Sequence, residues 1–338
     1  AAGDELHRSV LTPSPMPKIS PRELVDNYGR CAAHVELAAA VSPRLMRELW
    51  AERPRGPVVA TAPFARLERV GHDIWALVST PLGGDYTTVS NGGIVAGRNA
   101  VLAIEGFQTP KGAAWLAEHA RTLTGRWPTH VLVTHYHSDH ANGVAGYVTA
   151  DQHPVVRATQ ITRDEVLARN TPADADRTAA LGDAVLLSPT DVATLDLGGR
   201  SIRIIPQLGH TDSDVALELD DSDLVFCGDL FWNAMFPNYV DAIPSKLSAS
   251  VRVLRARNAA TYVPGHGAVG TPADLDRYTA MIDDVERAAR QAHAAGTSAK
   301  DAAAAYHIPA STGEWAMFGK TFIERAFTAW DRELGGAG

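Results

Sequence analysis

The residues best suited to chemistry lie in one run of six, residues 135–140, which supplies three imidazoles and one carboxylate: His135, His137, His140 and Asp139. The preceding residues, 130–134, form an apolar run that predicts a buried strand. A strand that ends at such a cluster leaves these side chains at its carboxyl edge, where α/β proteins build their sites. Imidazole nitrogen and carboxylate oxygen are the usual non-thiolate ligands of zinc. Four of them converging away from water would leave their desolvation uncompensated, so the run predicts a bound cation.

Three more candidate ligands follow along the chain, and each lies next to a glycine: His210, Asp229 and His266. Glycine lets the backbone approach an ion without a Cβ clash. Asp229 and His266 also follow segments that are predicted to be strands. Taken singly, each of the three is more typical of an ordinary turn. Together with residues 135–140 they form a set of seven donors at strand ends, and that coincidence favours a metal site.

The elements that must position these donors are short strands and helices. The predicted strands cover 64–70, 74–79, 87–95, 100–105, 130–134, 193–197, 201–205, 215–219, 224–227 and 261–263. The predicted helices cover 110–123, 245–256 and, with breaks near 296 and 309, the residues from 272 to the end. The order of strands followed by a helix occurs in both halves of the chain. It predicts an α/β fold in which two sheets lie between helical layers.

The first 57 residues are expected to form an N-terminal extension. Several prolines keep its first part extended, residues from 21 to about 50 have the apolar spacing of a helix, and Pro54 and Pro57 end that helix. This helical arm either packs on the main domain or forms the contact of a homodimer. The predicted organisation is therefore an arm at 1–57, a main domain at 58–278, and C-terminal helices at 279–338 that pack on the same domain.

The composition is that of an ordinary globular protein, with 338 residues, 45% of them hydrophobic, and a formal net charge of −8. That charge argues against nucleic acid and anionic membrane as partners, and no apolar run approaches the roughly 20 residues that a membrane helix needs.

The two cysteines do not form a disulfide framework, and Cys227 is expected in the core. The chain begins with Ala-Ala-Gly. A periplasmic or secreted location is expected if a signal peptide was removed, and otherwise a cytoplasmic one.

With these motifs, the chain resembles the metallo-β-lactamase fold superfamily over roughly residues 64–278. The resemblance rests on the His-x-His-x-Asp-His run at 135–140 and on the Pro-Gly-His-Gly segment at 264–267. It implies a four-layer αββα sandwich with a two-metal site at one edge of the sheets. The implied metals are two zinc ions per chain, with iron or manganese as alternatives. The ligands implied are His135, His137 and His210 for one metal, Asp139, His140 and His266 for the second, and Asp229 between both.

The function that the resemblance implies is a dinuclear zinc-dependent hydrolase, in which a hydroxide that bridges the metals attacks the carbonyl of a small-molecule substrate. Asp139 would orient the hydroxide and pass a proton to the leaving group. β-Lactamases of this fold usually lack the bridging aspartate, so Asp229 favours the general metallohydrolases, such as lactonases and glyoxalase-II-type thioesterases. An ester, lactone, thioester or β-lactam all fit this chemistry. The alternative is a mononuclear iron-dependent oxygenase, similar to sulfur dioxygenases, because the ligand set alone does not separate the two.

The residues expected to meet the substrate follow Asp229. The segment 230–239 is rich in aromatic side chains and forms either an apolar substrate wall or part of the core. Tyr239, at its end, is a candidate donor to an oxyanion and is taken as a second catalytic residue beside Asp139. Asp214 is either a hydrogen-bond partner of a ligating histidine or part of a turn. The aromatic residues within 315–327 have near-helical spacing and are expected in the core.

Overall fold

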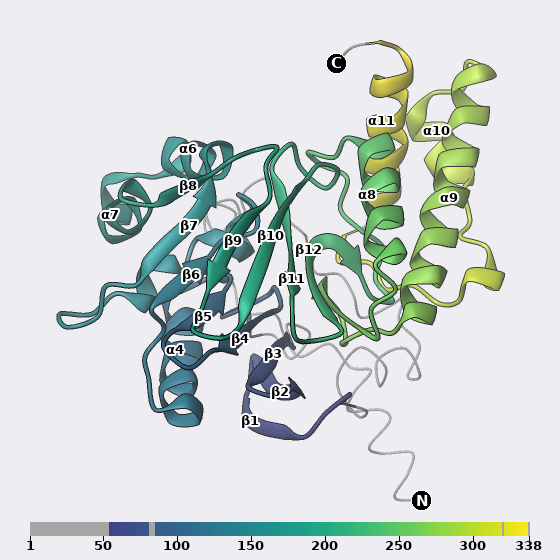
Figure 1. Cartoon of the computed structure of the whole chain (residues 1–338). Helices are drawn as coiled ribbons and strands as arrows, with labels where there is room; N and C mark the ends of the chain where they lie inside the picture. Colours follow the sequence, from purple (N-terminus) through teal and green to yellow (C-terminus); the bar gives the residue numbers. More distant parts are fainter. Residues whose placement is uncertain (1–53, 81–84, 320, 337–338) are drawn as a thin grey trace, which may run out of the picture.

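The chain folds into two β-sheets with helices on their outer sides, and Figure 1 shows this layered arrangement in the computed structural model. The structure describes residues 54–80, 85–319 and 321–336. The predicted αββα sandwich is confirmed. The N-terminal arm predicted for 1–57, with its homodimer contact, lies almost wholly outside the described residues and stays a prediction.

The first sheet has eight strands that are hydrogen-bonded in the order of the sequence. They are β1 (Val58–Ala62), β2 (Ala65–Gly71), β3 (Ile74–Ser79), β4 (Gly92–Ala96), β5 (Val101–Ile104), β6 (His130–Leu132), β7 (Val155–Thr159) and β8 (Val185–Leu187). Strands β1 to β5 pair antiparallel, and β5 to β8 pair parallel. Parallel pairing places the carboxyl ends of β5 and β6 side by side, so the loops that follow them meet at one edge of the sheet.

The second sheet has five strands in the order β13-β12-β11-β10-β9. They are β9 (Ala193–Asp196), β10 (Ser201–Gln207), β11 (Asp214–Leu219), β12 (Leu224–Trp232) and β13 (Thr261–His266). Only β12 and β13 pair parallel, so these two neighbours end at the same edge. The hairpin between β9 and β10 turns at Gly198 and Gly199, whose φ angles of 87° and 75° are left-handed and suit glycine.

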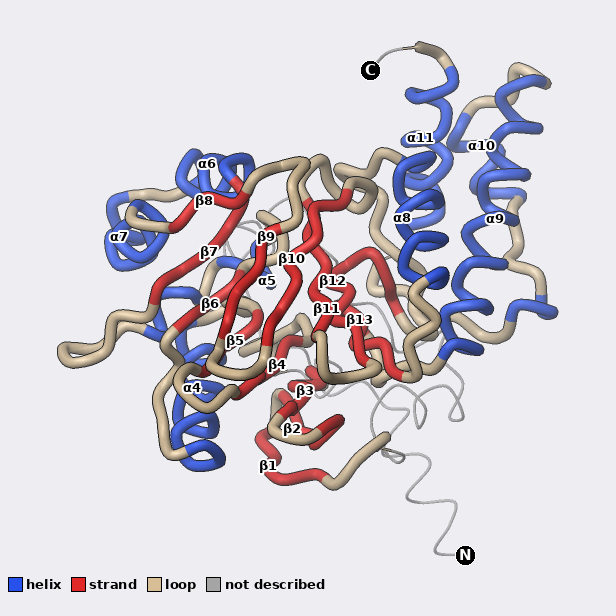
Figure 2. The backbone as a smooth tube through the Cα atoms, in the orientation of Figure 1, coloured by secondary structure: helices blue, strands red, loops and turns tan. Residues whose placement is uncertain are grey.

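Helices cover the outer sides of the two sheets, as the blue segments of Figure 2 show. The first sheet carries α4 (Pro110–Thr124), α6 (Gln160–Arg169) and α7 (Ala175–Gly182), and the second side carries α8 (Pro244–Ala256), α9 (Pro272–Ala294), α10 (Ala299–Ala305) and α11 (Phe322–Leu334). A short helix, α5 (Ser138–Ala141), contains half of the histidine run, and 3-10 turns occupy 144–147, 172–174 and 310–312. Among the described residues, no helix has the length and apolar composition needed to cross a membrane.

Each sheet buries apolar side chains on both faces, which gives three cores. Ile74 and Leu217 are fully buried between the two sheets. Leu67 and Leu116 are fully buried between the first sheet and α4. The third core lies between the second sheet and helices α8, α9 and α11, and it contains Cys227 as a free thiol together with the predicted C-terminal aromatic side chains. The burial of both faces explains why the strands are continuous apolar runs in the sequence.

Most of the predicted elements are present within one or two residues of their predicted ends. The strand predicted at 87–95 begins only at Gly92, because backbone groups of residues 87–91 bond to the β5–α4 loop and to Gly265. Strands β12 and β13 extend further than predicted, through Asp229 and His266. The elements between 148 and 192 were not predicted. The division at residue 278 stays a prediction, and α9 runs across it.

One buried arginine fastens the two sheets together at the edge opposite the histidine run. The Arg200 guanidinium, which follows the β9–β10 turn, donates to the backbone carbonyls of Ala96 and His72, each at 2.8 Å. These carbonyls belong to the first sheet and its β2–β3 turn. Asp221 accepts from Arg200 Nε at 2.9 Å and balances the charge. Because Arg200 is only 7% exposed, these carbonyls have no access to water if the guanidinium is removed.

The substitution Arg200→Met tests this fastening. It keeps much of the apolar side chain but leaves buried carbonyls unpaired, so we expect the free energy of unfolding to fall by about 2–4 kcal/mol. Urea denaturation of the metal-free protein measures the change. The control is Arg203→Met, because Arg203 lies three residues further along on β10, has a side chain that is 43% exposed and makes a surface ion pair with Glu218. Equal stability of the two variants would contradict the assignment.

Candidate metal centre

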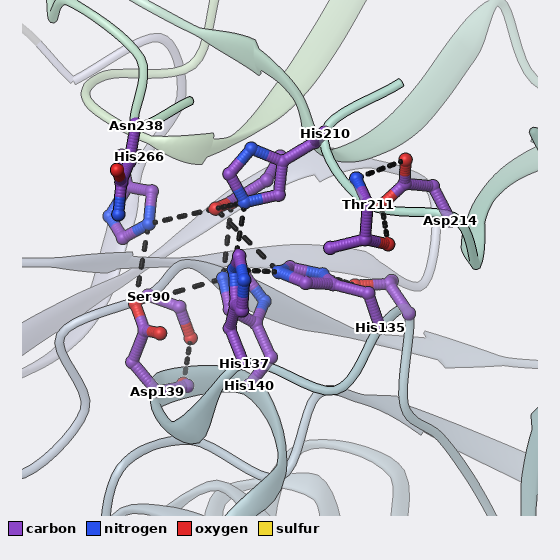
Figure 3. A network of polar contacts seen from close by, with 12 residues as sticks. Ser90, His135, His137, Asp139, His140, His210, Thr211, Asp214, Asn238 and His266 are labelled. Atoms are coloured by element: carbon purple, nitrogen blue, oxygen red, sulfur yellow. Dashed lines mark hydrogen bonds and ion pairs between the residues drawn. The ribbon is translucent and has the colours of Figure 1, made fainter. Parts of the chain in front are cut away.

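The seven predicted ligands come from five segments that end at one edge of the molecule. They are the loop after β6 (His135 and His137), helix α5 (Asp139 and His140), the loop after β10 (His210), strand β12 (Asp229) and the end of β13 (His266). Because β5, β6, β12 and β13 all direct their carboxyl ends to this edge, donors that are up to 131 residues apart in the chain become neighbours. Figure 3 shows the side chains of the five histidines and of Asp139 directed toward a common centre.

The ligand atoms fall into two groups, and within each group they lie within 4.8 Å of one another. The first group is His135, His137, His210 and Asp229, and the second is Asp139, His140 and His266. None of these seven residues is more than 5% exposed. The structure therefore brings together all seven residues that the sequence singled out, and it separates them into the two sets that the resemblance implied.

Asp229 is in contact with both groups. Its Oδ2 lies 3.1 Å from His210 Nε2 in the first group and 3.4 Å from His266 Nε2 in the second. Its Oδ1 lies 3.1 Å from His140 Nε2, which also belongs to the second group. A carboxylate whose oxygens face donors of both groups is suited to be shared by two cations.

Several donors, mainly in the second group, approach one another without forming the hydrogen bonds that would satisfy them. His140 Nε2 and Asp229 Oδ1 are only 3.1 Å apart, yet both atoms lack a hydrogen-bond partner. Asp139 Oδ1 and both ring nitrogens of His266 are also buried without a partner. Such atoms cost free energy, and an unpaired carboxylate costs most. Donors that converge on a shared centre, and not on each other, fit metal ions of the zinc type.

The charges of the site also favour cations. Burial acts to lower the pKa of His140, but Asp229, Glu105 and Asp139 outweigh it and hold this pKa well above its usual value. Burial likewise acts against His266, yet Asp229 and Asp139 raise its pKa to about 9. For Asp229 burial acts to raise the pKa, and the imidazoles of His140 and His266 hold it well below its ordinary value. The carboxylates thus remain ionised and attract positive charge, which metal ions can supply in place of protons.

Hydrogen bonds behind the first group fix which ring nitrogen faces the centre. Asp241 Oδ2 accepts from His137 Nε2 at 3.1 Å, so the lone pair of His137 lies on Nδ1. Thr134 Oγ1 donates its proton to Glu105 Oε1 at 2.6 Å and therefore accepts from His135 Nδ1 at 3.0 Å. The lone pair of His135 then lies on Nε2. Both lone pairs face the centre, as metal ligation requires.

Glu105 supports the second group as well. Its Oε1 lies 3.0 Å from His140 Nδ1, which directs His140 Nε2 toward Asp229. Glu105 is 2% exposed and has a φ angle of 78°, a strained conformation that a glutamate keeps only when its surroundings hold it. Thr134 N donates to its side chain at 3.2 Å, and the Tyr147 hydroxyl donates to its backbone carbonyl at 2.7 Å. One carboxylate thus orients a histidine in each group.

Two backbone features hold the segment that carries His266. A Cβ atom on Gly265 would lie 1.8 Å from Asp229 Oδ1, so only glycine leaves room for the shared carboxylate. Asn91 Nδ2 donates to the carbonyls of Pro264 and Gly267 at 2.9 and 2.7 Å, on either side of His266. Asn91, next to β4 of the first sheet, therefore fixes the segment of the second sheet that carries His266.

Two further predicted residues lie outside this ligand set. Asp214 accepts from Thr211 N at 3.0 Å and from Thr211 Oγ1 at 2.8 Å, so it closes the turn after His210 and holds no ligand histidine. Tyr239 is 2% exposed and packs against Phe236 with a ring distance of 6.1 Å. Burial raises its pKa. No described contact joins Tyr239 to the seven donors, and its catalytic role stays a prediction.

The predicted aromatic segment after Asp229 divides between core and site. Phe231 and Phe236 are fully buried in the third core. The ring of Trp232 lies 4.0 Å from that of His266, and Phe318 from the C-terminal region lies 5.7 Å from the same histidine. Phe318 was predicted only as core, since helical spacing in a sequence does not reveal which aromatic residue borders a site.

Comparison with known proteins identifies the family. The family model described as the metallo-beta-lactamase superfamily matches residues 106–266. A hydroxyacylglutathione hydrolase of Acidiphilium cryptum is 30% identical over 206 residues, which are 60% of this chain and 74% of that protein. One from Cupriavidus taiwanensis is 31% identical over 129 residues, 37% of this chain and 45% of that protein. The chain spans about half the length of the first curated relatives it matches. The chain belongs to the metallo-β-lactamase superfamily.

Solved structures agree with this assignment at the level of the fold. A metallo-β-lactamase of Erythrobacter litoralis superposes with a TM-score of 0.52 and 16% identity, over 68% of this chain and 100% of that one. The sec-alkylsulfatase Pisa1 of Pseudomonas sp. superposes with a TM-score of 0.61 and 14% identity, over 79% of this chain and 50% of that one. At these identities the likeness concerns the arrangement of strands and helices alone.

The substitution Gly265→Ala tests the position of Asp229. The added Cβ must displace the shared carboxylate, so we expect the metal content after loading to fall to half of the wild-type value or less. Inductively coupled plasma mass spectrometry measures the content. The control is Gly182→Ala, because a Cβ there meets no atom within 4 Å. Full metal content in Gly265→Ala would show that the carboxylate is not a ligand.

The substitution Glu105→Gln tests whether Glu105 orients the histidines for metal binding. It keeps the shape but replaces one acceptor oxygen with an NH2 donor, so the amide can no longer accept both from Thr134 N on one side and from Thr134 Oγ1 and His140 Nδ1 on the other. We expect the metal affinity to fall about 10–100-fold. Competition with a chromophoric chelator measures it. Glu118→Gln, on the exposed side of α4, is the matched control. If Glu105→Gln and Glu118→Gln bound the metal with equal affinity, Glu105 would stabilise the fold without supporting metal binding.

Proposed function

We propose that the chain is a metal-dependent hydrolase that holds two zinc ions and cleaves a carbonyl substrate, with a thioester or ester as the favoured class. The observation that carries the proposal is the Asp229 carboxylate, which contacts both of the buried donor groups. Membership of the metallo-β-lactamase superfamily supports metal-dependent hydrolysis. Relatives named hydroxyacylglutathione hydrolase support a thioester.

Each donor has a place in this proposal: His135, His137 and His210 hold the first ion, Asp139, His140 and His266 the second, and Asp229 both. When bound, the ions supply Lewis acidity toward the substrate carbonyl and lower the pKa of water, so that a nucleophile is present near neutral pH. Three of the histidines are oriented before a metal binds, because Thr134, Asp241 and Glu105 lie at the outer nitrogens of His135, His137 and His140 respectively.

Asp139 is the residue that we assign to proton transfer. Its Oδ2 faces His266 Nε2 at 3.3 Å, whereas its Oδ1 is buried without a partner. Oδ1 can therefore accept a proton from the attacking water and return it to the leaving group. The Ser90 hydroxyl donates to the backbone carbonyl of Asp139 at 2.5 Å and fixes the segment that carries this carboxylate.

The aromatic side chains beside His266 favour a substrate with an apolar acyl group. Trp232 and Phe318 both contact the His266 ring, and their own rings are 6.1 Å apart. Ligand sites combine such apolar walls with a few polar groups that fix orientation. An acyl chain against this wall would place its carbonyl next to the second donor group.

The substitution His137→Ala tests the proposed function. The wild-type chain, loaded with zinc, is expected to hold two ions and to hydrolyse p-nitrophenyl butyrate, S-phenyl thioacetate or γ-butyrolactone. Removal of this ligand is expected to lower metal content and to reduce kcat/KM by about 100-fold or more, because metal binding and turnover both depend on the His137 ring nitrogen. Steady-state kinetics and metal analysis of the same samples measure both.

The matched control is His72→Ala, since His72 has a side chain that is 81% exposed and lies outside both groups. Turnover and metal content that are unchanged in His137→Ala would contradict the ligand assignment. One iron per chain in the natively produced protein, with no hydrolysis after zinc loading, would overturn the hydrolase and favour the iron-dependent oxygenase.

A further inference from the structure

Two of the five histidines in the donor groups differ from the others in how they are held. In His135, His137 and His140 the outer ring nitrogen faces a hydroxyl or carboxylate oxygen at 3.0 or 3.1 Å. In His210 and His266 the nitrogen that faces the centre is Nε2, and Nδ1 is buried without a hydrogen-bond partner among the described residues. Ligating histidines are usually oriented through the outer nitrogen. Another kind of contact must therefore orient these two rings.

The indole of Trp232 contacts both of these histidines. Its ring centroid lies 4.0 Å from that of His266, with 41° between the ring planes, and 6.0 Å from that of His210. Trp232 is 4% exposed. Since His210 belongs to the first donor group and His266 to the second, one aromatic side chain borders both groups. Rings in contact at these distances restrict the rotation of each other.

The second sheet fixes where this indole lies. Trp232 is the last residue of β12 and is in register with His266 of β13, which places the two side chains next to each other. Asn233 N donates to the carbonyl of His266 at 2.9 Å and holds the two strands together at this point. The rings of Phe318 and Phe322 meet the indole nearly edge-on, at 6.1 and 6.3 Å. The indole is thus held by the fold itself, independently of any bound ion.

We propose that Trp232 is a positioning residue for the metal ligands. Its indole holds the imidazoles of His210 and His266 in the orientation that ligation requires, in place of the hydrogen bonds that orient the other three histidines. The inference rests on the ligand assignment of the proposed function, and it does not depend on the substrate. The ions concerned are divalent metals that accept imidazole nitrogen, such as Zn²⁺ and Co²⁺.

The rival explanation is that Trp232 only fills the core that it shares with the C-terminal helices. Trp330 of α11 offers a matched control, because it belongs to the same core, is 1% exposed and also has a buried indole nitrogen without a partner. Its described ring contact is with Arg290, which is not a metal ligand. Trp232→Leu and Trp330→Leu therefore remove the same atoms from one core, and only the first removes a contact with the ligands.

We expect both leucine variants to lose stability in urea, because each leaves a cavity in the core, and only Trp232→Leu to lose metal affinity. Competition with a chromophoric chelator is expected to give a Kd for Co²⁺ about 10–100-fold above that of the wild type in Trp232→Leu, and within about twofold of it in Trp330→Leu. The visible absorption spectrum of the Co²⁺-loaded protein reports the ligand geometry, and we expect its bands to shift in Trp232→Leu alone.

Trp232→Phe serves as a conservative second variant. It keeps an aromatic ring next to His266 and removes less volume, but a single ring is expected to lose the more distant contact with His210. We therefore expect a Kd for Co²⁺ about 3–10-fold above that of the wild type, between the values for the wild type and Trp232→Leu. If Trp232→Leu does not fold, the comparison of Trp232→Phe with Trp330→Phe decides the inference.

The outcomes distinguish this inference from the proposed function. If the variants at Trp232 and Trp330 bind Co²⁺ equally and give the same spectrum, the role of Trp232 is overturned and the hydrolase stands. If the wild type binds the metal but hydrolyses none of the substrates, the hydrolase fails, and the metal titrations still decide the inference. A wild type that takes up no metal would overturn both, because the histidines are then not ligands.

Discussion

The structure depends on one electrostatic constraint, the burial of three carboxylates beside five imidazoles at the meeting point of two sheets. Asp139, Asp229 and Glu105 are at most 5% exposed. Buried carboxylates are tolerated only where opposite charge and hydrogen bonds replace the lost water. The imidazoles face them at contact distance but leave several atoms of both kinds unpartnered. Metal ions held by these donors would satisfy the unpartnered atoms that face the centre, so the geometry of the fold and that of the site depend on each other.

This constraint determines how the sheets must be held. The donors come from both sheets, and a small slip between the sheets would separate Asp229 from His140. The molecule prevents such a slip at both edges. Arg200 binds carbonyls of the first sheet at the far edge, and Asn91 binds the carbonyls that flank His266 at the near edge. At each edge the contact is made by hydrogen bonds of a polar side chain whose groups are all paired. Because hydrogen bonds are directional, they fix the relative position of the two sheets as well as holding them together.

The sequence predicted the parts of this design that have a local signature. The histidine run has a spacing that few other structures produce, and glycines beside His210 and His266 mark close backbone approach. The supporting residues have no such signature. Glu105 and Asp241 are single charged residues whose partners are 29 and 104 positions away. Residues 87–91 were predicted as strand from their β-branched composition, yet their backbone serves the loops around the site, because tertiary contacts override propensity.

The C-terminal region contributes the part of the proposed substrate wall that lies outside the family match. The ligands are set by strand ends that the family match covers, and these leave little freedom for variation. The wall that a substrate meets is built differently. Ala316 pairs with the segment after β12 through hydrogen bonds to Ala234 and Phe236, which carries Phe318 to the side of His266. In the proposed function, the metal ligands come from the strand ends and their loops, whereas the wall beside His266 combines Trp232 of β12 with Phe318 from the loop before α11, so the ligands and part of the wall can change independently.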